Sequence, residues 1–159
     1  MSHAYALGQW YIFELEVRRA APWSDELRGL ITSHFWNGGE ADQKPPVCSD
    51  DGLELVVKMP ARGSIDAAGH VTMGGTSYSI DKRLCGRPLS YNLDHFEGQI
   101  DPQLQEFQST NNDGGRFVNE PTVFRRVKCL DPPRKELPAT VKPPAFEPGA
   151  AHRAVGCSR

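Results

Sequence analysis

Apolar and charged residues alternate along residues 9–19. An extended chain here would carry apolar side chains on one face and carboxylates on the other. The apolar positions are Tyr11, Phe13, Leu15 and Val17, and the acidic positions are Glu14 and Glu16. A period of two residues predicts a half-buried β-strand. Trp10 and Ile12 make the second face partly apolar at its start, so we expect another element to cover that end.

The same alternation returns further along the chain. Residues 53–59 place Leu53, Leu55, Val57 and Met59 on one face. Short alternating runs separated by glycine-containing turns fill residues 64–81, and residues 117 and 122–130 resemble closing strands. We therefore expect a mostly antiparallel β-sheet or small open barrel over about residues 5–130.

One early segment instead shows helical spacing. Ser24 can cap a helix, acidic residues follow it, and Leu27, Leu30 and Ile31 form one stripe. The pattern predicts an amphipathic helix that ends near residues 37–39, where glycine can close it. Asp101-Pro102 suggests a second short helix over residues 102–109. The expected fold class is α+β.

The C-terminal part differs in composition and charge. Of the chain's 159 residues, the first 118 carry 10 basic and 16 acidic side chains, whereas residues 119–159 carry 8 and 4. Six of the 13 prolines lie between residues 131 and 148, where they prevent a helix or a strand ladder. We expect a strand-rich domain over residues 1–130 and an extended, basic, proline-rich tail over residues 131–159.

Several function classes find little support in the sequence. A net charge of −2 offers no broad surface for nucleic acid, and no apolar run is long enough to span a bilayer. The five histidines stand singly and the four cysteines are widely spaced, so we expect neither a metal site nor a cofactor. Without a visible export signal, we expect a soluble, cytoplasmic protein.

Gly8-Gln9-Trp10 opens the first expected strand. These three residues resemble the glycine-x-tryptophan opening of lipocalins. The resemblance implies a small barrel that holds an apolar ligand. The early expected helix, and the lack of a recognisable packing helix before the proline-rich tail, depart from the lipocalin pattern.

The strongest candidate for acid–base chemistry is the adjacent pair Asp94-His95. A carboxylate can orient an imidazole that titrates near neutral pH. Cys85 could supply a thiolate beside His70 or His95. Adjacent residues point in different directions on a strand, and no nucleophile or oxyanion motif stands beside the pair. A structural histidine is therefore the competing interpretation.

Two groups of residues are candidates for binding a partner. The first is aromatic and lies beside a glycine pair: Trp23, His34, Phe35 and Trp36. The second is basic and lies at the start of the tail: Arg125, Arg126, Lys128, Arg134 and Lys135. A helix end packed on a sheet would account for the aromatic group equally well, and a solvated strand edge would account for the basic one.

Taken together, these patterns favour a non-catalytic binding or accessory protein that docks to a protein partner. The contacts would come from loops, the aromatic group and the tail. The alternative is a small β-rich enzyme, or a pocket for a small ligand, that uses Asp94, His95 and Cys85.

Overall fold

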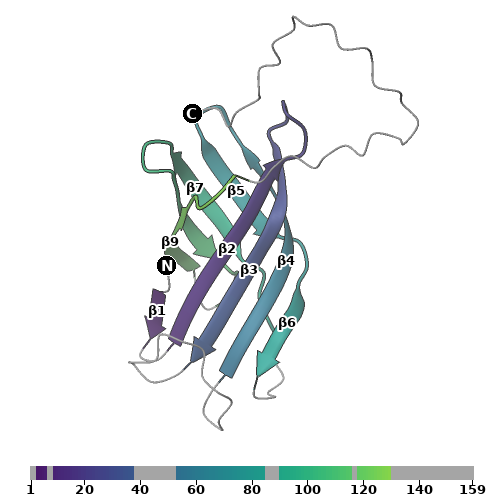
Figure 1. The fold of residues 1–159 in the computed structure, drawn as a ribbon, viewed down its shortest axis with the longest axis vertical. Coiled ribbons are helices and arrows are strands. Elements are labelled where there is room, and N and C mark those ends of the chain that lie inside the picture. Colours follow the sequence, from purple (N-terminus) through teal and green to yellow (C-terminus); the bar gives the residue numbers. More distant parts are fainter. Residues whose placement is uncertain (1–2, 7–8, 38–52, 85–89, 116–117, 130–159) are drawn as a thin grey trace, which may run out of the picture. The chain divides into compact units, whose positions relative to one another are not determined.

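The computed structural model describes residues 3–6, 9–37, 53–84, 90–115 and 118–129 (Figure 1). Within these residues the chain forms nine β-strands and no helix. The strands are β1 (His3–Ala6), β2 (Gln9–Arg19), β3 (Glu26–Asn37), β4 (Leu53–Ile65), β5 (His70–Gly75), β6 (Ser79–Leu84), β7 (His95–Asp101), β8 (Glu106–Asn112) and β9 (Val118–Arg125). The expected strands over 9–19, 53–59 and the following meander are confirmed.

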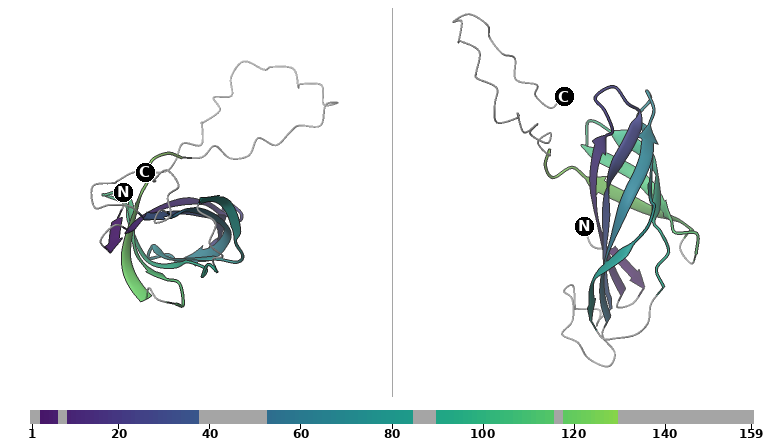
Figure 2. Two further views of the ribbon diagram at one scale, coloured as in Figure 1. Left: turned by 90° about the horizontal axis from the view of Figure 1, so that it is seen from below. Right: turned by 90° about the vertical axis from the view of Figure 1, so that its right-hand side faces the viewer.

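All the strands belong to one antiparallel sheet, in the order β1-β2-β3-β4-β5-β7-β8-β9. The sheet curls until β9 approaches β2, which gives a nearly closed barrel (Figure 2). β6 lies off this path because β4 is longer than its partners. The second half of β4 pairs with β5 and its first half pairs with β6.

Pro60 sits where β4 changes partner from β5 to β6. Its carbonyl oxygen accepts hydrogen bonds from the backbone N–H of Thr76 (2.8 Å) and from the Thr76 hydroxyl (3.0 Å). In an antiparallel ladder, the N–H and C=O of one residue point to the same neighbouring strand. The donor that proline lacks would therefore fall at the break between β5 and β6, which explains why a central strand tolerates proline here.

The core fills the concave face of the sheet. Alternate residues of β3, β4 and β5 point inward, and Ile31, Val57 and Met59 are fully buried. Aromatic rings link the first long strand to the last ones. Phe96 of β7 makes edge-to-face contacts with Phe13 of β2 and Phe124 of β9, at centroid distances of 5.2 and 4.9 Å. These contacts connect β2 with β7 and β9 across the interior of the barrel.

The predicted amphipathic helix after Ser24 is wrong, because this segment forms β3. Its buried positions follow a period of two, as Leu27, Ile31 and Ser33 show, and not the helical stripe that includes Leu30. β3 pairs along its whole length with β4 and along most of it with β2. Burial between two long partners outweighs the local cap and spacing signals. Ser24 still makes a local bond, because its hydroxyl accepts one from the N–H of Glu26 (3.0 Å).

The predicted short helix over 102–109 is also wrong. Residues 102–105 form a turn and residues 106–112 form β8. Asp101 caps backbone N–H groups as expected, but Gln105 has a φ of 57°, a left-handed conformation that ends any helical path.

The chain divides into two compact units, Met1–Arg125 and Arg126–Arg159. The strands described above all belong to the first unit. Of the second, the structure describes only residues 126–129, so the predicted boundary at residue 130 and the proline-rich tail lie outside the described residues.

Candidate binding site

Three tight turns emerge at the same end of the barrel: residues 20–25, 66–69 and 102–105 (Figure 1). Hydrogen bonds join the first two turns to the next strand of the sheet. The N–H of Ile65 donates to the carbonyl of Asp25 (2.9 Å), and the N–H of Ile100 donates to the carbonyl of Gly69 (3.0 Å). The turns therefore form one continuous surface, here called the three-turn end.

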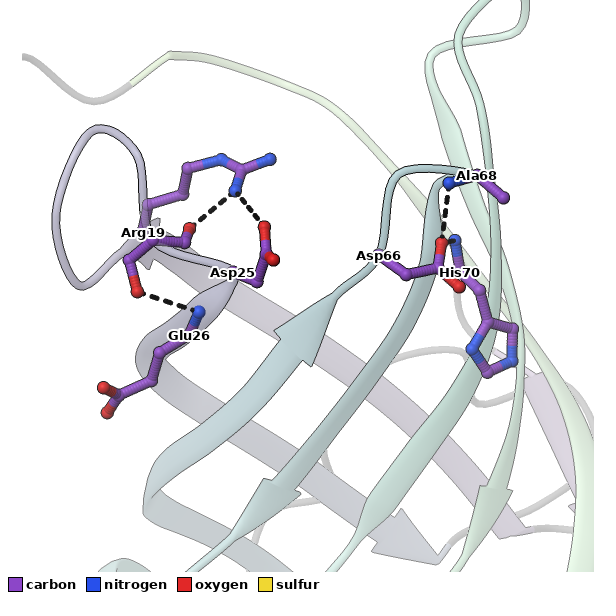
Figure 3. Close-up of polar contacts among 7 residues, drawn as sticks. Arg19, Asp25, Glu26, Asp66, Ala68 and His70 are labelled. Atoms are coloured by element: carbon purple, nitrogen blue, oxygen red, sulfur yellow. Dashed lines mark hydrogen bonds and ion pairs between the residues drawn. The ribbon is translucent and has the colours of Figure 1, made fainter.

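The turn between β2 and β3 is held by several polar contacts (Figure 3). The Arg19 guanidinium donates to the carbonyl of Ser24 (2.6 Å) and lies 3.5 Å from the Asp25 carboxylate. The N–H of Ala20 donates to the carbonyl of Glu26 (2.8 Å). Within this fixed turn, the Trp23 side chain is 86% exposed.

The turn between β4 and β5 is organised by one carboxylate (Figure 3). The Asp66 side chain accepts hydrogen bonds from the N–H groups of Ala68 (2.8 Å) and His70 (2.9 Å). Gly69 has a φ of 84°, which a residue with a side chain adopts only with strain. The carboxylate and the glycine together define the shape of this turn.

The turn between β7 and β8 is built in the same way. The Asp101 carboxylate accepts hydrogen bonds from the N–H groups of Gln103 (2.8 Å) and Leu104 (3.0 Å). The side-chain amide of Gln105 donates to the carbonyl of Pro102 (2.6 Å). Leu104 projects from this turn and is 59% exposed. The three-turn end thus presents two large apolar side chains, Trp23 and Leu104, on backbone held by local hydrogen bonds.

The structure does not bring the predicted aromatic group together. Trp23 lies before β3, whereas His34, Phe35 and Trp36 lie at the other end of that strand. Phe35 points inward and packs against Tyr11 at a centroid distance of 4.6 Å. Trp36 is 1% exposed, so it offers a partner no surface. Of the four predicted residues, only Trp23 is fully accessible.

His34 and Trp36 belong to a polar cluster on the outer face of the sheet. The Glu54 carboxylate lies 2.9 Å from His34 Nε2 and 2.9 Å from Lys82 Nζ. Burial alone would raise the pKa of Glu54, but the hydrogen bonds and charges of Lys82 and His34 outweigh it and lower that pKa. Trp36 covers the cluster on one side and stacks on Trp10 at 6.5 Å. This stack accounts for the apolar start of the outer face of β2.

The sequence offered no signal for Glu54 or Lys82. Each occupies an outward position of an alternating strand, where charged residues are ordinary. Their pairing depends on the register of β4 with β6, in which Val56 lies opposite Lys82.

Asp94 and His95, the predicted acid–base pair, face different surroundings. Asp94 is buried, and its carboxylate accepts hydrogen bonds from the Tyr91 hydroxyl (2.6 Å) and the Asn111 amide (2.6 Å). His95 is exposed, and its Nδ1 lies 2.9 Å from the carbonyl of Leu93. The two side chains thus make separate contacts. Cys85, the third member of that prediction, lies outside the described residues.

Burial dominates the electrostatics around Asp94. It raises the pKa of Asp94, and the nearby charge of Asp113 adds to this effect, while the bonds from Tyr91 and Asn111 oppose it. Burial and the Asp94 charge also raise the pKa of Tyr91. With both oxygens of Asp94 occupied, the cluster joins the segment before β7 to β8.

The predicted basic residues also lie in different surroundings. Arg125 forms an ion pair with the largely buried Glu106, with 2.5 Å between Nε and Oε1. Arg126 and Lys128 are exposed. Arg134 and Lys135 lie outside the described residues. Only Arg125 therefore has a defined role, which is to neutralise a carboxylate at the edge of the core.

Among the described residues, no group of three or more His, Cys, Asp or Glu side chains converges as metal ligands would. The described residues also contain no helix with the length and apolar character needed to cross a membrane. The fold is that of an antiparallel, nearly closed β-barrel with three hydrogen-bonded turns at one end. The chain shows no significant match to a protein-family model, a curated protein or a solved structure, the lipocalins included.

Proposed function

We propose that the protein is a non-catalytic binding protein that docks to a protein partner through the three-turn end. The observation that carries this proposal is the exposure of Trp23 in a turn held by hydrogen bonds. Tryptophan buries a large area on association and is enriched among the residues that dominate binding energy. Leu104, which projects from another turn at the same end of the barrel, provides a second apolar contact.

The rigidity of the turns favours binding. A loop that must become ordered on association loses conformational entropy, which weakens binding. Here the carboxylates of Asp66 and Asp101 already satisfy the backbone N–H groups of their turns. The turn that carries Trp23 is held by the Arg19 side chain and the Ala20 N–H, so burial of Trp23 should require little ordering of the loop. The contribution of the tail, including Arg134 and Lys135, stays a prediction.

The alternative of an enzyme or small-ligand pocket based on Asp94, His95 and Cys85 has less support. Both oxygens of the Asp94 carboxylate already accept hydrogen bonds from neighbouring side chains. His95 turns one ring nitrogen toward a backbone carbonyl. This arrangement suits a structural contact better than proton transfer to a substrate.

Site-specific photo-crosslinking tests the proposal. A benzoylphenylalanine at position 23 or 104 should crosslink the same protein from an extract of the native source. The same group at Val118 is the matched control, because Val118 is 54% exposed but begins β9 at the opposite end of the barrel. The Trp23→Ala variant should fail to compete for that partner while keeping the wild-type melting temperature. Equal crosslinking from position 118, or full competition by Trp23→Ala, would overturn the proposal.

A further inference from the structure

Three arginines occupy one row on the outer face of the sheet. In the strand registers, Arg18 of β2 lies opposite Arg28 of β3, and Arg28 lies opposite Arg62 of β4. All three side chains are exposed. Neighbouring strands are about 4.8 Å apart, so the row brings three guanidinium groups within reach of one another. We call these residues the arginine row.

Like charges directly opposite each other on a sheet destabilise it. Only Arg28 has an acidic partner, since its Nε lies 3.0 Å from Glu26 Oε1. Within the described part of the chain, Arg18 and Arg62 form neither a hydrogen bond nor an ion pair through their side chains. The described side chains thus relieve this repulsive arrangement only at Arg28.

The row continues toward His95. Arg62 lies opposite Gly74 of β5, and Gly74 lies opposite His95 of β7. The His95 ring covers Gly74, where any side chain would collide with it. Its Nδ1 is engaged by the carbonyl of Leu93, which leaves Nε2 for another contact. A glycine thus makes room for a fourth nitrogen-bearing side chain in the same row.

We propose that the arginine row binds a phosphate group carried by the protein partner, next to the docking surface at the three-turn end. A guanidinium presents paired N–H donors that match phosphate oxygens, and a phosphate ester carries nearly two negative charges at neutral pH. Two guanidiniums on adjacent strands can share one such group. Glu16 and Glu26 lie on the same face, so the affinity comes from this geometry and not from bulk positive charge.

The position of the row links it to Trp23. Arg18 and Arg28 form an outward pair of the β2–β3 hairpin close to its turn, and Trp23 projects from that turn. One partner can therefore bury Trp23 and place a phosphate on the row. That the phosphate belongs to a protein partner rests on the proposed function. Phosphate binding by the arginine row can nevertheless be measured without that partner.

The test uses a synthetic peptide that carries two phosphoserines separated by one residue. Its affinity is compared with that of peptides bearing serine or glutamate at both positions, and of a single-stranded RNA of similar charge, by fluorescence anisotropy. We expect the phosphopeptide to bind best and to shift the Nε–Hε signals of Arg18 and Arg62 in NMR spectra. Replacement of either arginine by glutamine should weaken binding roughly tenfold, as expected for one hydrogen bond to a charged group.

Arg126→Gln is the matched control, because it removes one exposed arginine outside the row. Arg126→Gln should leave peptide binding unchanged. The peptide assay contains no partner protein, so failure of this inference is distinguishable from failure of the docking proposal. Because they relieve repulsion, Arg18→Gln and Arg62→Gln should melt at or above the wild-type temperature. Equal binding of the serine or glutamate peptide, tighter binding of RNA, or an equal loss in Arg126→Gln would overturn the inference.

Discussion

The Tyr91 hydroxyl donates a 2.6 Å hydrogen bond to the buried carboxylate of Asp94. A carboxylate in this position depends on neutral donors, here Tyr91 and Asn111. Because burial raises the pKa of Asp94 above 3.8, the folded state binds its proton more tightly than the unfolded state does. The contribution of Asp94 to stability therefore decreases as the pH rises from about 3.8 through the pKa of Asp94 in the folded state.

Replacement of Tyr91 by phenylalanine should destabilise the fold by about 1–3 kcal/mol at neutral pH, the cost of leaving a buried charged acceptor short of a donor. The loss should shrink at acidic pH, because a protonated Asp94 needs fewer donors. Urea unfolding of wild type and variant at two pH values measures this difference. A pH-independent loss would show that the phenol acts through packing alone.

Glu54 should give the opposite pH dependence. The hydrogen bonds and charges of Lys82 and His34 lower the pKa of Glu54 below 4.5 against the effect of burial, so the fold favours the ionised form. Its stabilisation is complete above about pH 4.5 and is lost as the pH falls through the folded-state pKa. Glu54→Gln should reduce the acid sensitivity of the melting temperature in this range. An unchanged acid profile in the variant would contradict the assignment.

Lys82→Met should destabilise the fold by about 1–3 kcal/mol at neutral pH, because Glu54 would keep, among the described residues, only His34 as a side-chain partner. Lys58→Met is a suitable control, since Lys58 pairs with an exposed carboxylate, Asp81. Exposed pairs contribute little, so the control should lose less than about 1 kcal/mol. Chemical denaturation of both variants decides the point, and equal losses would refute the special role of Glu54.

Gly69→Ala should lower stability more than Gly114→Ala. Both glycines have positive φ, so each substitution brings a strain of about 1 kcal/mol. At Gly69, an added Cβ would also lie 3.0 Å from the side-chain nitrogen of Gln99, whereas nothing lies within 4 Å at Gly114. The two melting temperatures measure the additional cost, and equal shifts would mean that Gln99 yields without penalty.

Deletion of residues 131–159 should leave the melting temperature nearly unchanged. The described core residues that pack together lie between Phe13 and Phe124, so the deletion removes none of them. The same deletion should weaken capture of the partner if the tail contributes contacts. A large fall in melting temperature would contradict the view of the tail as an exchangeable arm.

Alternation alone predicted most of the sheet, because strands with one buried face must repeat every two residues. It failed at β3, where Leu27, Leu30 and Ile31 also satisfy helical spacing. That error carried over to the candidate site. A helix would have kept Trp23 near Trp36, whereas an extended strand carries them to opposite ends of the barrel.

The arginine row illustrates a different limit. Arg18, Arg28 and Arg62 are far apart along the chain, and none is unusual for a strand that alternates. Only the register between strands sets them opposite one another, and register depends on long-range pairing and turn geometry. Trp23, in contrast, could be named from the sequence as a candidate for partner binding, although its exposure depends on the turn that holds it.

The proline in the middle of β4 also bears on how the barrel assembles. The paired register of the hairpin that turns at residues 66–69 ends at Ala61 and Gly75. Beyond it, the Thr76 N–H bonds the Pro60 carbonyl, but Pro60 has no N–H to return the bond. The incoming chain must leave the ladder at Thr76 and join it again at Ser79. Pro60 therefore marks the point where two separate ladders meet on one strand.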